Sequence, residues 1–164
     1  MDSNIIDINN KIENLESAPA SIEELIKGKV IRLKSWKGDY LHRPDSKQGV
    51  TTWNTGIGNE WTVEYVKSDK KDNKDNKEIK ENIGVYKLKS WKEDYLHRPD
   101  SNQGVTSLDS GIGNEWTIEY SKENNGAFEF KSWKGDYLHR PDSNQGVTSL
   151  DTGLGNQWTI EFKD

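Results

Sequence analysis

The sequence contains no cysteine and no long run of apolar residues. Without thiols the chain has neither a disulfide framework nor a thiolate metal site, so nothing in it marks an oxidising compartment. A membrane-spanning helix needs roughly 18 or more apolar residues in a row, and the acidic amino terminus lacks the apolar core of a signal peptide. We therefore expect a soluble, cytoplasmic protein without a membrane span, and the same features leave non-classical export open.

The sequence also has fewer basic than acidic residues. The 23 lysines and arginines are outnumbered by 28 aspartates and glutamates, which gives a formal net charge of −5. Binding to a nucleic-acid backbone depends on clustered cations, so we expect no nucleic-acid partner. Only 30% of the residues are hydrophobic, but they recur at regular positions, which favours a small ordered core over disorder.

One stretch of sequence is present in three copies. Lys34-Ser-Trp-Lys-Gly-Asp-Tyr-Leu-His-Arg-Pro-Asp45 returns almost unchanged from Lys89 and from Lys131, and each copy continues into a motif like Gly-Ile-Gly-Asn-Glu-Trp61. Residues 30–65 and 85–120 agree at 27 of 36 positions, and so do residues 85–120 and 127–162. The repeats are about 42 residues long, so the fold must pack three like units.

Each copy has the pattern of four short strands. In the first copy, Ile31 and Leu33 alternate with charged residues, and a second run around Leu41 ends at a proline. A third run begins at Val50, and a fourth alternating run begins at Trp61. Three such copies predict twelve strands in an all-β fold.

Three four-stranded units exclude a propeller, which needs roughly four to eight blades. The architecture that closes with three units is the β-trefoil, a six-stranded barrel capped by three hairpins with pseudo-threefold symmetry. Closure removes the exposed sheet edges that a monomeric all-β protein would otherwise have to protect. We therefore predict a β-trefoil domain over residues 30–164, preceded by a short helical segment.

The repeats resemble a known family. The ordered elements x-Leu-Lys-Ser, Gly-x-Tyr-Leu, Gly-Val-Thr and Asn-Glu-Trp-Thr-Val-Glu are similar to the repeat of fascin-like β-trefoils over residues 30–162. A looser similarity links Asn59-Glu-Trp61 to the Gln-x-Trp signature of ricin-type β-trefoil lectins. The resemblance implies the fold, while trefoils host actin bundlers, glycan lectins, inhibitors and growth factors.

Two segments lie outside the repeats. Residues 1–29 are predicted to be helical, with an apolar stripe at Ile5, Ile8, Ile12 and Leu15, and a capping box beginning at Ser21. This segment is either a strap on the domain or a surface for self-association or partner docking. Residues 66–84 form a lysine-rich and acidic insertion, which we predict to be a flexible loop that is either solubilising or partner-binding.

The first candidate site combines a tryptophan, a carboxylate and an amide in each copy. The turn tryptophan either folds back onto the barrel or offers an aromatic face on which a sugar ring can stack. The first and third turns of a copy are expected at the same end, so these groups would converge into a site for hydroxyl-rich ligands. The carbohydrate-binding candidates are Trp36, Asp39 and Asn59, with Trp91, Asp94 and Asn114, and Trp133, Asp136 and Asn156.

A second candidate cluster is expected toward the opposite end of each copy. In one interpretation the arginine and aspartate form a pair that closes the second hairpin. In the other, the cluster forms a polar ligand pocket in which the arginine binds a carboxylate or phosphate. The cluster comprises His42, Arg43 and Asp45, with His97, Arg98 and Asp100, and His139, Arg140 and Asp142.

Catalytic chemistry has little support in the sequence. No nucleophile is tied to the repeated histidine and aspartate, and one histidine per copy does not make a chelating cluster. We expect no enzymatic activity, no cofactor and no metal site. The sequence predicts a non-enzymatic binding module, with a multivalent carbohydrate-binding lectin as the leading hypothesis. The alternative is a fascin-like actin, cytoskeletal or other protein-interaction module.

Overall fold

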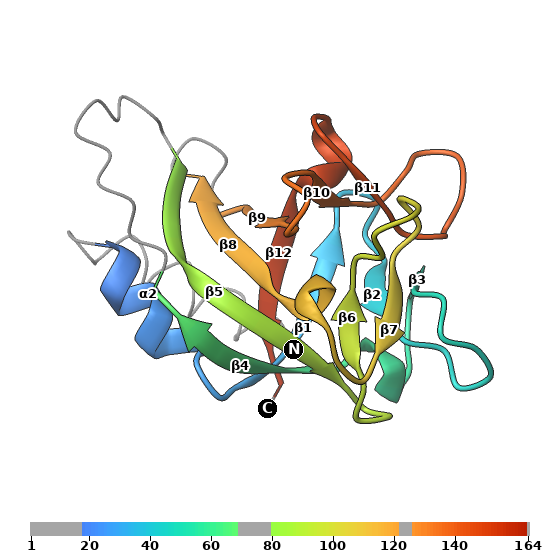
Figure 1. The fold of residues 1–164 in the computed structure, drawn as a ribbon, viewed down its shortest axis with the longest axis horizontal. Helices are drawn as coiled ribbons and strands as arrows, with labels where there is room; N and C mark the ends of the chain where they lie inside the picture. The colour runs from blue at the N-terminus through green and yellow to red at the C-terminus, as the bar shows by residue number, and fades with distance from the viewer. Residues whose placement is uncertain (1–17, 69–79, 122–125, 164) are drawn as a thin grey trace.

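The computed structural model describes residues 18–68, 80–121 and 126–163, and the predicted stripe of Ile5, Ile8, Ile12 and Leu15 lies outside these ranges. The described residues form twelve strands, one α-helix and three short 3₁₀ turns (Figure 1). The first repeat contains β1 (Val30–Ser35), β2 (Tyr40–His42), β3 (Thr51–Trp53), η1 (Ile57–Asn59) and β4 (Trp61–Lys67). The second contains β5 (Lys80–Ser90), β6 (Tyr95–His97), β7 (Thr106–Leu108), η2 (Ile112–Asn114) and β8 (Trp116–Ser121). The third contains β9 (Phe128–Lys131), β10 (Tyr137–His139), β11 (Thr148–Leu150), η3 (Leu154–Asn156) and β12 (Trp158–Phe162).

Six of these strands close into a barrel. The antiparallel pairs are β1 with β4, β4 with β5, β5 with β8, β8 with β9, β9 with β12 and β12 with β1. The other six strands pair as the three hairpins β2–β3, β6–β7 and β10–β11. This is the predicted β-trefoil, and the hairpins lie together at one end of it (Figure 1).

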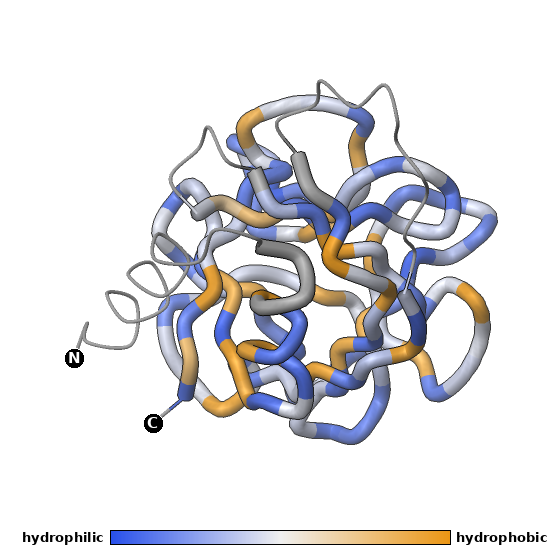
Figure 2. The backbone as a smooth tube through the Cα atoms, turned by 90° about the vertical axis from the view of Figure 1, so that its left-hand side faces the viewer, coloured by the Kyte–Doolittle hydropathy of each residue, from blue (hydrophilic) through white to orange (hydrophobic). Residues whose placement is uncertain are grey.

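The alternation of residue types explains why these segments are strands. Along β1 every second side chain is buried, and hydrophobic and hydrophilic residues alternate along the chain when it is viewed from the α2 side (Figure 2). The barrel strands place Trp61, Trp116 and Trp158 in the core with at most 1% exposure. Each indole N–H donates to a backbone carbonyl of the second strand in its own repeat, so the core tryptophans are satisfied as well as buried.

A ring of backbone hydrogen bonds joins the three hairpins at the pseudo-threefold axis. The amide of Val50 donates to the carbonyl of Val105 (3.1 Å), Val105 donates to Val147 (3.0 Å), and Val147 donates back to Val50 (3.1 Å). The three valine side chains are buried. The hairpin end of the barrel is therefore closed by the repeats themselves.

The helix α2 (Ala18–Ile26) lies at the opposite side of the barrel from the hairpins (Figure 1). Ile22 and Ile26 are fully buried in the core, and Gly28 follows with a φ of 75°, which ends the helix. The helix begins three residues before the capping box that the sequence predicted, because Pro19 fits the first turn of a helix. No helix among the described residues is long and apolar enough to span a membrane.

The barrel strands extend into the predicted loop of residues 66–84. β4 continues to Lys67 and β5 already begins at Lys80, so residues 66–67 and 80–84 of this segment belong to the sheet. The extension includes a register shift around Gly84, whose φ is 119°. Residues 80–82 are the polar run Lys-Glu-Asn without period-two alternation, which is why composition predicted a loop here.

Candidate functional site

The turn that carries Trp36 is bound to the neighbouring repeat. The indole N–H of Trp36 donates to the carbonyl of Arg140 at 2.8 Å, and the Lys37 ammonium lies 5.0 Å from the centre of the indole ring. The second and third copies make the same contacts, from Trp91 to Arg43 and from Trp133 to Arg98. Trp36 remains 37% exposed, so the turn tryptophan packs on the neighbouring repeat and still presents part of its surface to solvent.

The carboxylates of this turn are buried in ion pairs that also join repeats. Asp94 accepts hydrogen bonds from Nε and Nη2 of Arg43, the latter at 2.7 Å, while Nη1 of Arg43 donates to two backbone carbonyls of its own loop. Arg98 pairs with Asp136, and Arg140 pairs with Asp39, in the same way. Each arginine thus binds a carboxylate, as the sequence predicted, but this carboxylate belongs to an aspartate of the protein and not to a ligand.

The burial and the pairing act on the pKa of these carboxyls in opposite directions. Burial on its own would raise the pKa of Asp94, but hydrogen bonds from Arg43, Ser90 and Ser107 and the charge of Arg43 outweigh it. The pKa of Asp94 therefore lies below its usual value of 3.8, and that of Asp39 and Asp136 is lowered for the same reasons. All three remain ionised at neutral pH.

A lysine that follows the turn tryptophan also contacts the second predicted cluster. Lys92 donates to Asp45 at 2.8 Å on the surface, and its hydrogen bond and charge lower the pKa of Asp45. The equivalent pairs are Lys134 with Asp100 and Lys37 with Asp142. We call this set of contacts between the first turn of one repeat and the second turn of its neighbour the inter-repeat clasp.

The clasp corrects two predictions from the sequence. The two clusters do not lie at opposite ends, because the first turn of each repeat packs on the second turn of the neighbouring one. Nor are Asp39 and Asn59 open to a ligand beside Trp36, since both side chains are buried and hydrogen-bonded to other groups of the protein. The equivalent triads follow the same pattern: Trp91, Asp94 and Asn114, and Trp133, Asp136 and Asn156.

Asn59 is buried and fixes the neighbouring histidine. Its Nδ2 donates to the carbonyl of Trp53 at 3.4 Å, so Oδ1 is the acceptor that faces Nδ1 of His42 at 2.7 Å. Nδ1 therefore carries the proton, and Nε2 is left as an acceptor with no hydrogen-bond partner among the described residues. Asn114 and Asn156 hold His97 and His139 in the same arrangement.

The glycines of the Gly-x-Gly-Asn motif make room for this histidine. A Cβ atom on Gly58 would lie 2.6 Å from Cε1 of His42 and still closer to the carbonyl oxygen of Arg43. The motif is thus a 3₁₀ turn against which the imidazole ring rests, rather than a ligand loop of its own. Gly113 and Gly155 meet the same two groups in their repeats.

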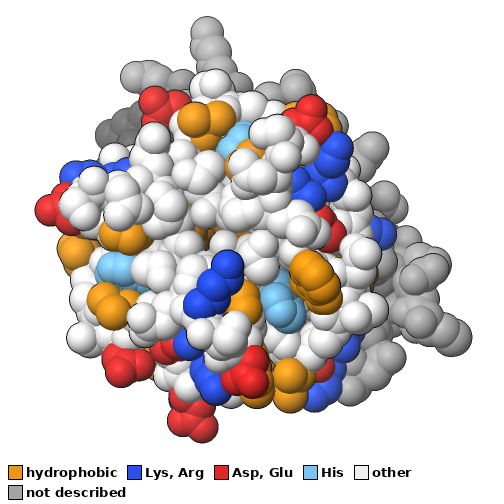
Figure 3. Space-filling model, turned by 90° about the vertical axis from the view of Figure 1, so that its right-hand side faces the viewer, with side chains coloured by type: hydrophobic (Ala, Val, Ile, Leu, Met, Phe, Trp, Pro, Cys, Tyr) orange, Lys and Arg blue, Asp and Glu red, His pale blue; other side chains and the backbone are white. Residues whose placement is uncertain are grey.

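Exposed hydrophobic side chains surround each of the three histidines. Figure 3 views the hairpin end and shows hydrophobic side chains on the surface beside the histidines. We call these groups His patches one, two and three. They consist of His42, Trp53 and Ile57; His97, Leu108 and Ile112; and His139, Leu150 and Leu154.

These apolar residues were missed by the sequence predictions. Each lies at the end of the third strand or the start of the 3₁₀ turn and is 40–59% exposed, where folding alone would favour a polar residue. The available signal was Trp53, an aromatic residue that precedes the polar turn Asn54-Thr55-Gly56 and has no place in the alternation of buried positions. The other large hydrophobic residues exposed in the described ranges are Trp36 and Trp133 of the clasp.

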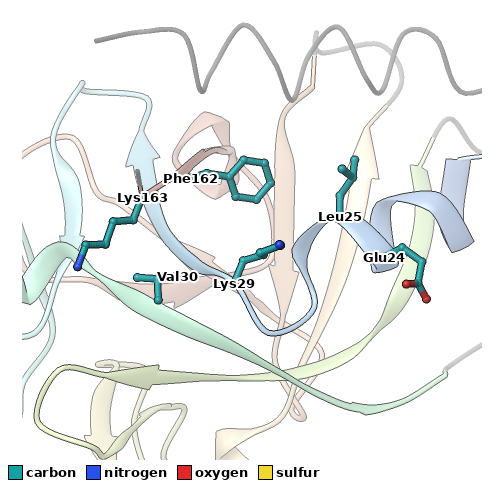
Figure 4. A pocket seen from close by; sticks show the side chains of 6 residues that line it. All are labelled: Glu24, Leu25, Lys29, Val30, Phe162 and Lys163. Atoms are coloured by element: carbon teal, nitrogen blue, oxygen red, sulfur yellow. The ribbon is translucent and has the colours of Figure 1, made fainter.

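A separate pocket of about 310 Å³ lies at the side of the barrel that carries α2 (Figure 4). Leu25, Val30 and Phe162 give it an apolar wall, and Glu24, Lys29 and Lys163 add charges of both signs. Lys163 is already paired with Glu60 at 3.2 Å. None of its six lining residues belongs to the repeated motifs that begin at Lys34 and at Gly56 or to their equivalents. Nowhere in residues 18–68, 80–121 and 126–163 do three or more acidic, histidine or cysteine side chains form a group that could hold a metal ion.

Comparison with known proteins identifies the fold. No protein-family model matches the sequence, and no curated protein matches it either. Among solved structures, "SeviL bound to asialo-GM1 saccharide" is similar with a TM-score of 0.62 and 12% identity, over 84% of this chain and 100% of that one. The BEL β-trefoil in an apo crystal form gives a TM-score of 0.64 and 13% identity, over 84% of this chain and 94% of that one.

Other similar structures are much longer proteins. The GlcNAcα1-4Gal-releasing endo-β-galactosidase from Clostridium perfringens gives a TM-score of 0.64 and 12% identity, over 83% of this chain. The chain spans about a third of that enzyme and 18% of a mosquitocidal holotoxin. At these identities the likeness shows the β-trefoil fold alone. Membership of the fascin family is not shown by it, so that resemblance remains a prediction from sequence motifs.

Proposed function

We propose that the protein is a non-enzymatic binding module of the lectin type, which recognises glycans through the His patches on its hairpin end. The observation that carries the proposal is the gathering of exposed apolar side chains around three identically held histidines on one face. Clasp residues have folding partners that account for their recurrence, whereas the exposed apolar side chains of the patches lie outside the hydrophobic core formed by the described residues.

The chemistry of a patch suits a ligand with both apolar and hydroxyl surfaces. A sugar ring presents C–H groups on one face and hydroxyls around its edge, so it needs an apolar wall beside a hydrogen-bonding group. Trp53 supplies the wall in patch one, and Nε2 of His42 supplies an acceptor held in one orientation by Asn59. A ring already fixed by the protein loses little freedom when it binds a ligand.

A glycan array tests this proposal. The wild-type protein is expected to give signals, and the variant with Ile57→Ser, Ile112→Ser and Leu154→Ser is expected to lose them, because these exposed residues border the patches without supporting the core. Lys37→Gln serves as the matched control, since it alters the exposed clasp pair with Asp142 and should keep the wild-type signals. If the wild-type protein binds no glycan on the array, the lectin proposal is wrong.

A second candidate function is a protein-interaction module of the fascin-like kind. It is favoured by patches two and three, where the paired aliphatic residues Leu108 with Ile112 and Leu150 with Leu154 resemble the apolar centre of a protein interface. Co-sedimentation with actin filaments tests the cytoskeletal form of this candidate. Retention of the protein in the supernatant at every filament concentration would remove it.

A further inference from the structure

The three His patches share one scaffold but differ in the side chains that a ligand would touch. In every copy an asparagine bridges the histidine Nδ1 to the carbonyl of the residue at the end of the third strand. That residue is Trp53 in patch one, but Leu108 and Leu150 in the others. The next residue is Asn54 in patch one, but Asp109 and Asp151 in the others.

Trp53 differs from the six other tryptophans of the protein. The indole N–H groups of those six each donate to a backbone carbonyl. The Trp53 indole N–H makes no hydrogen bond to the described residues, and the side chain is 51% exposed. Its ring lies 6.3 Å from the His42 ring at an angle of 34°, so the two rings form one tilted surface.

Patch one and the adjoining Asn54 therefore combine an open aromatic face with three polar groups. The indole N–H is a donor, Nε2 of His42 is an acceptor, and the exposed amide of Asn54 both donates and accepts. Neither Trp53 nor Asn54 can carry a charge. Patches two and three replace the aromatic face by a smaller aliphatic one and place a carboxylate beside it.

We propose, on the basis of the lectin function above, that each molecule binds one uncharged sugar, in patch one, and that patches two and three do not bind sugars. The apolar C–H face of the sugar stacks on Trp53, and its hydroxyls bond to the indole N–H, to Nε2 of His42 and to the Asn54 amide. The sequence repeats three times, but the site does not, so the molecule is monovalent for glycans. The proposal departs from the sequence prediction of three equivalent sites.

The test compares variants that exchange residues between patches. Trp53→Leu gives patch one the wall of the other two, and the double variant Leu108→Trp, Asp109→Asn gives patch two the wall and the amide of patch one. Both exchanges use residues that occur at the same position of another repeat, so the fold accepts them. The probe is the uncharged array glycan with the strongest wild-type signal, measured by isothermal titration calorimetry.

We expect one bound glycan per wild-type molecule, at least roughly tenfold weaker binding for Trp53→Leu, and two bound glycans for the double variant. A wild-type stoichiometry of three, unchanged affinity in Trp53→Leu, or a stoichiometry that stays at one in the double variant would each overturn the single-site proposal while leaving the lectin function standing. A wild-type protein that binds no glycan on the array would instead overturn the lectin function itself.

Discussion

Each buried arginine of the clasp donates the hydrogen bonds of its guanidinium to groups of the protein itself. Arg43 donates to both oxygens of Asp94 and to the carbonyls of Pro44 and Lys47, and only 5% of the residue is exposed. A pair of charges removed from water in this way is stable only while both members are present. At the residue scale, the arginine and the aspartate therefore stabilise the fold and are not available to a ligand.

Removing one member of this pair should destabilise the protein strongly. Asp94→Asn leaves the Arg43 charge buried without its counter-charge, and we expect the free energy of unfolding to fall by about 3–5 kcal/mol in urea denaturation. Asp45→Asn is the control, because the Asp45–Lys92 pair is exposed to solvent, and its loss should change the free energy of unfolding far less than Asp94→Asn does. Equal effects of the two substitutions would contradict this assignment.

The turn after the first strand of each repeat needs a left-handed residue. Gly38 and Gly135 have φ values of 90° and 93°, and Glu93 holds the same position in the second repeat with a φ of 72°. Only glycine takes this conformation without a steric penalty of about 1–2 kcal/mol. Because no atom lies within 4 Å of a Cβ added at Gly38 or Gly135, the backbone conformation alone sets the effect there.

Exchanging these residues should therefore have opposite effects on stability. Glu93→Gly is expected to raise the free energy of unfolding by up to about 1 kcal/mol, and Gly38→Ala to lower it by about 1 kcal/mol. The midpoint of urea unfolding measures both. A loss of stability in Glu93→Gly would mean that the Glu93 side chain makes a contact that outweighs the backbone strain.

At the scale of elements, the 3₁₀ turn and the second strand form one unit in each repeat. The turn η1 lies against His42 of β2 and the following Arg43, and its Gly58 carbonyl accepts a hydrogen bond from the Arg43 amide at 2.9 Å. Asn59 at the end of the turn then holds the histidine ring. The position of the His patch thus depends on the close approach of Gly58 to the His42 ring and the Arg43 carbonyl, which only glycine allows.

A methyl group at this approach should disturb the whole unit. Gly58→Ala places Cβ against the His42 ring and the Arg43 carbonyl, and we expect a loss of about 1–3 kcal/mol from overpacking, seen as a lower midpoint of thermal unfolding. Gly49→Ala is the control, because nothing lies within 4 Å of its Cβ, and it should stay within about 0.5 kcal/mol of the wild type. A Gly58→Ala variant as stable as Gly49→Ala would mean that the turn is not held against β2.

The sequence was sufficient to predict the strands but not the contacts between turns. Period-two alternation reports which face of a strand is buried, so the four strands of each repeat and the core role of Trp61 could be read directly. Which turn meets which depends on the rotation between repeats, and no local pattern encodes it. The partner of Arg43 therefore had to be seen in the structure, because it lies 51 residues away in another copy.

The sequence and the structure direct attention to different candidate sites for a related reason. Identical recurrence drew attention to Trp36, Asp39 and Asn59, yet recurrence follows equally from contacts that build a threefold fold. The residue that stands out chemically, Trp53, is the one that does not recur. In a repeat protein of this kind, departures from the repeat at exposed positions are the better guide to a site.

At the scale of the whole molecule, the clasp closes on itself. Repeat two binds repeat one, repeat three binds repeat two, and repeat one binds repeat three through Arg140 and Asp39. The contacts thus link the beginning of the domain to its end, as the pairing of β1 with β12 also does. We expect the three repeats to unfold together rather than one at a time.

The clasp also makes the stability of the molecule sensitive to acid. The pKa values of Asp39, Asp94 and Asp136 in the folded protein lie below the value of 3.8 expected when it is unfolded. The unfolded chain therefore takes up protons first as the pH falls, and the stabilisation by these pairs is present above that value and lost below it. Urea midpoints should change little between about pH 7 and 5.5 and then fall steadily below about pH 5. A midpoint that is the same at about pH 3 as at pH 7 would contradict this.

The central claim is that ligands bind at the hairpin end through Trp53 and not at the clasp. The most direct measurement is an NMR titration of the seven indole N–H signals with the uncharged glycan that gives the strongest array signal. The Trp53 signal should shift on binding, because its N–H lies on the open face of patch one, while the six indoles bonded to backbone carbonyls should stay in place. Shifts of Trp36, Trp91 and Trp133 with an unmoved Trp53 would place the ligand on the clasp and contradict the account.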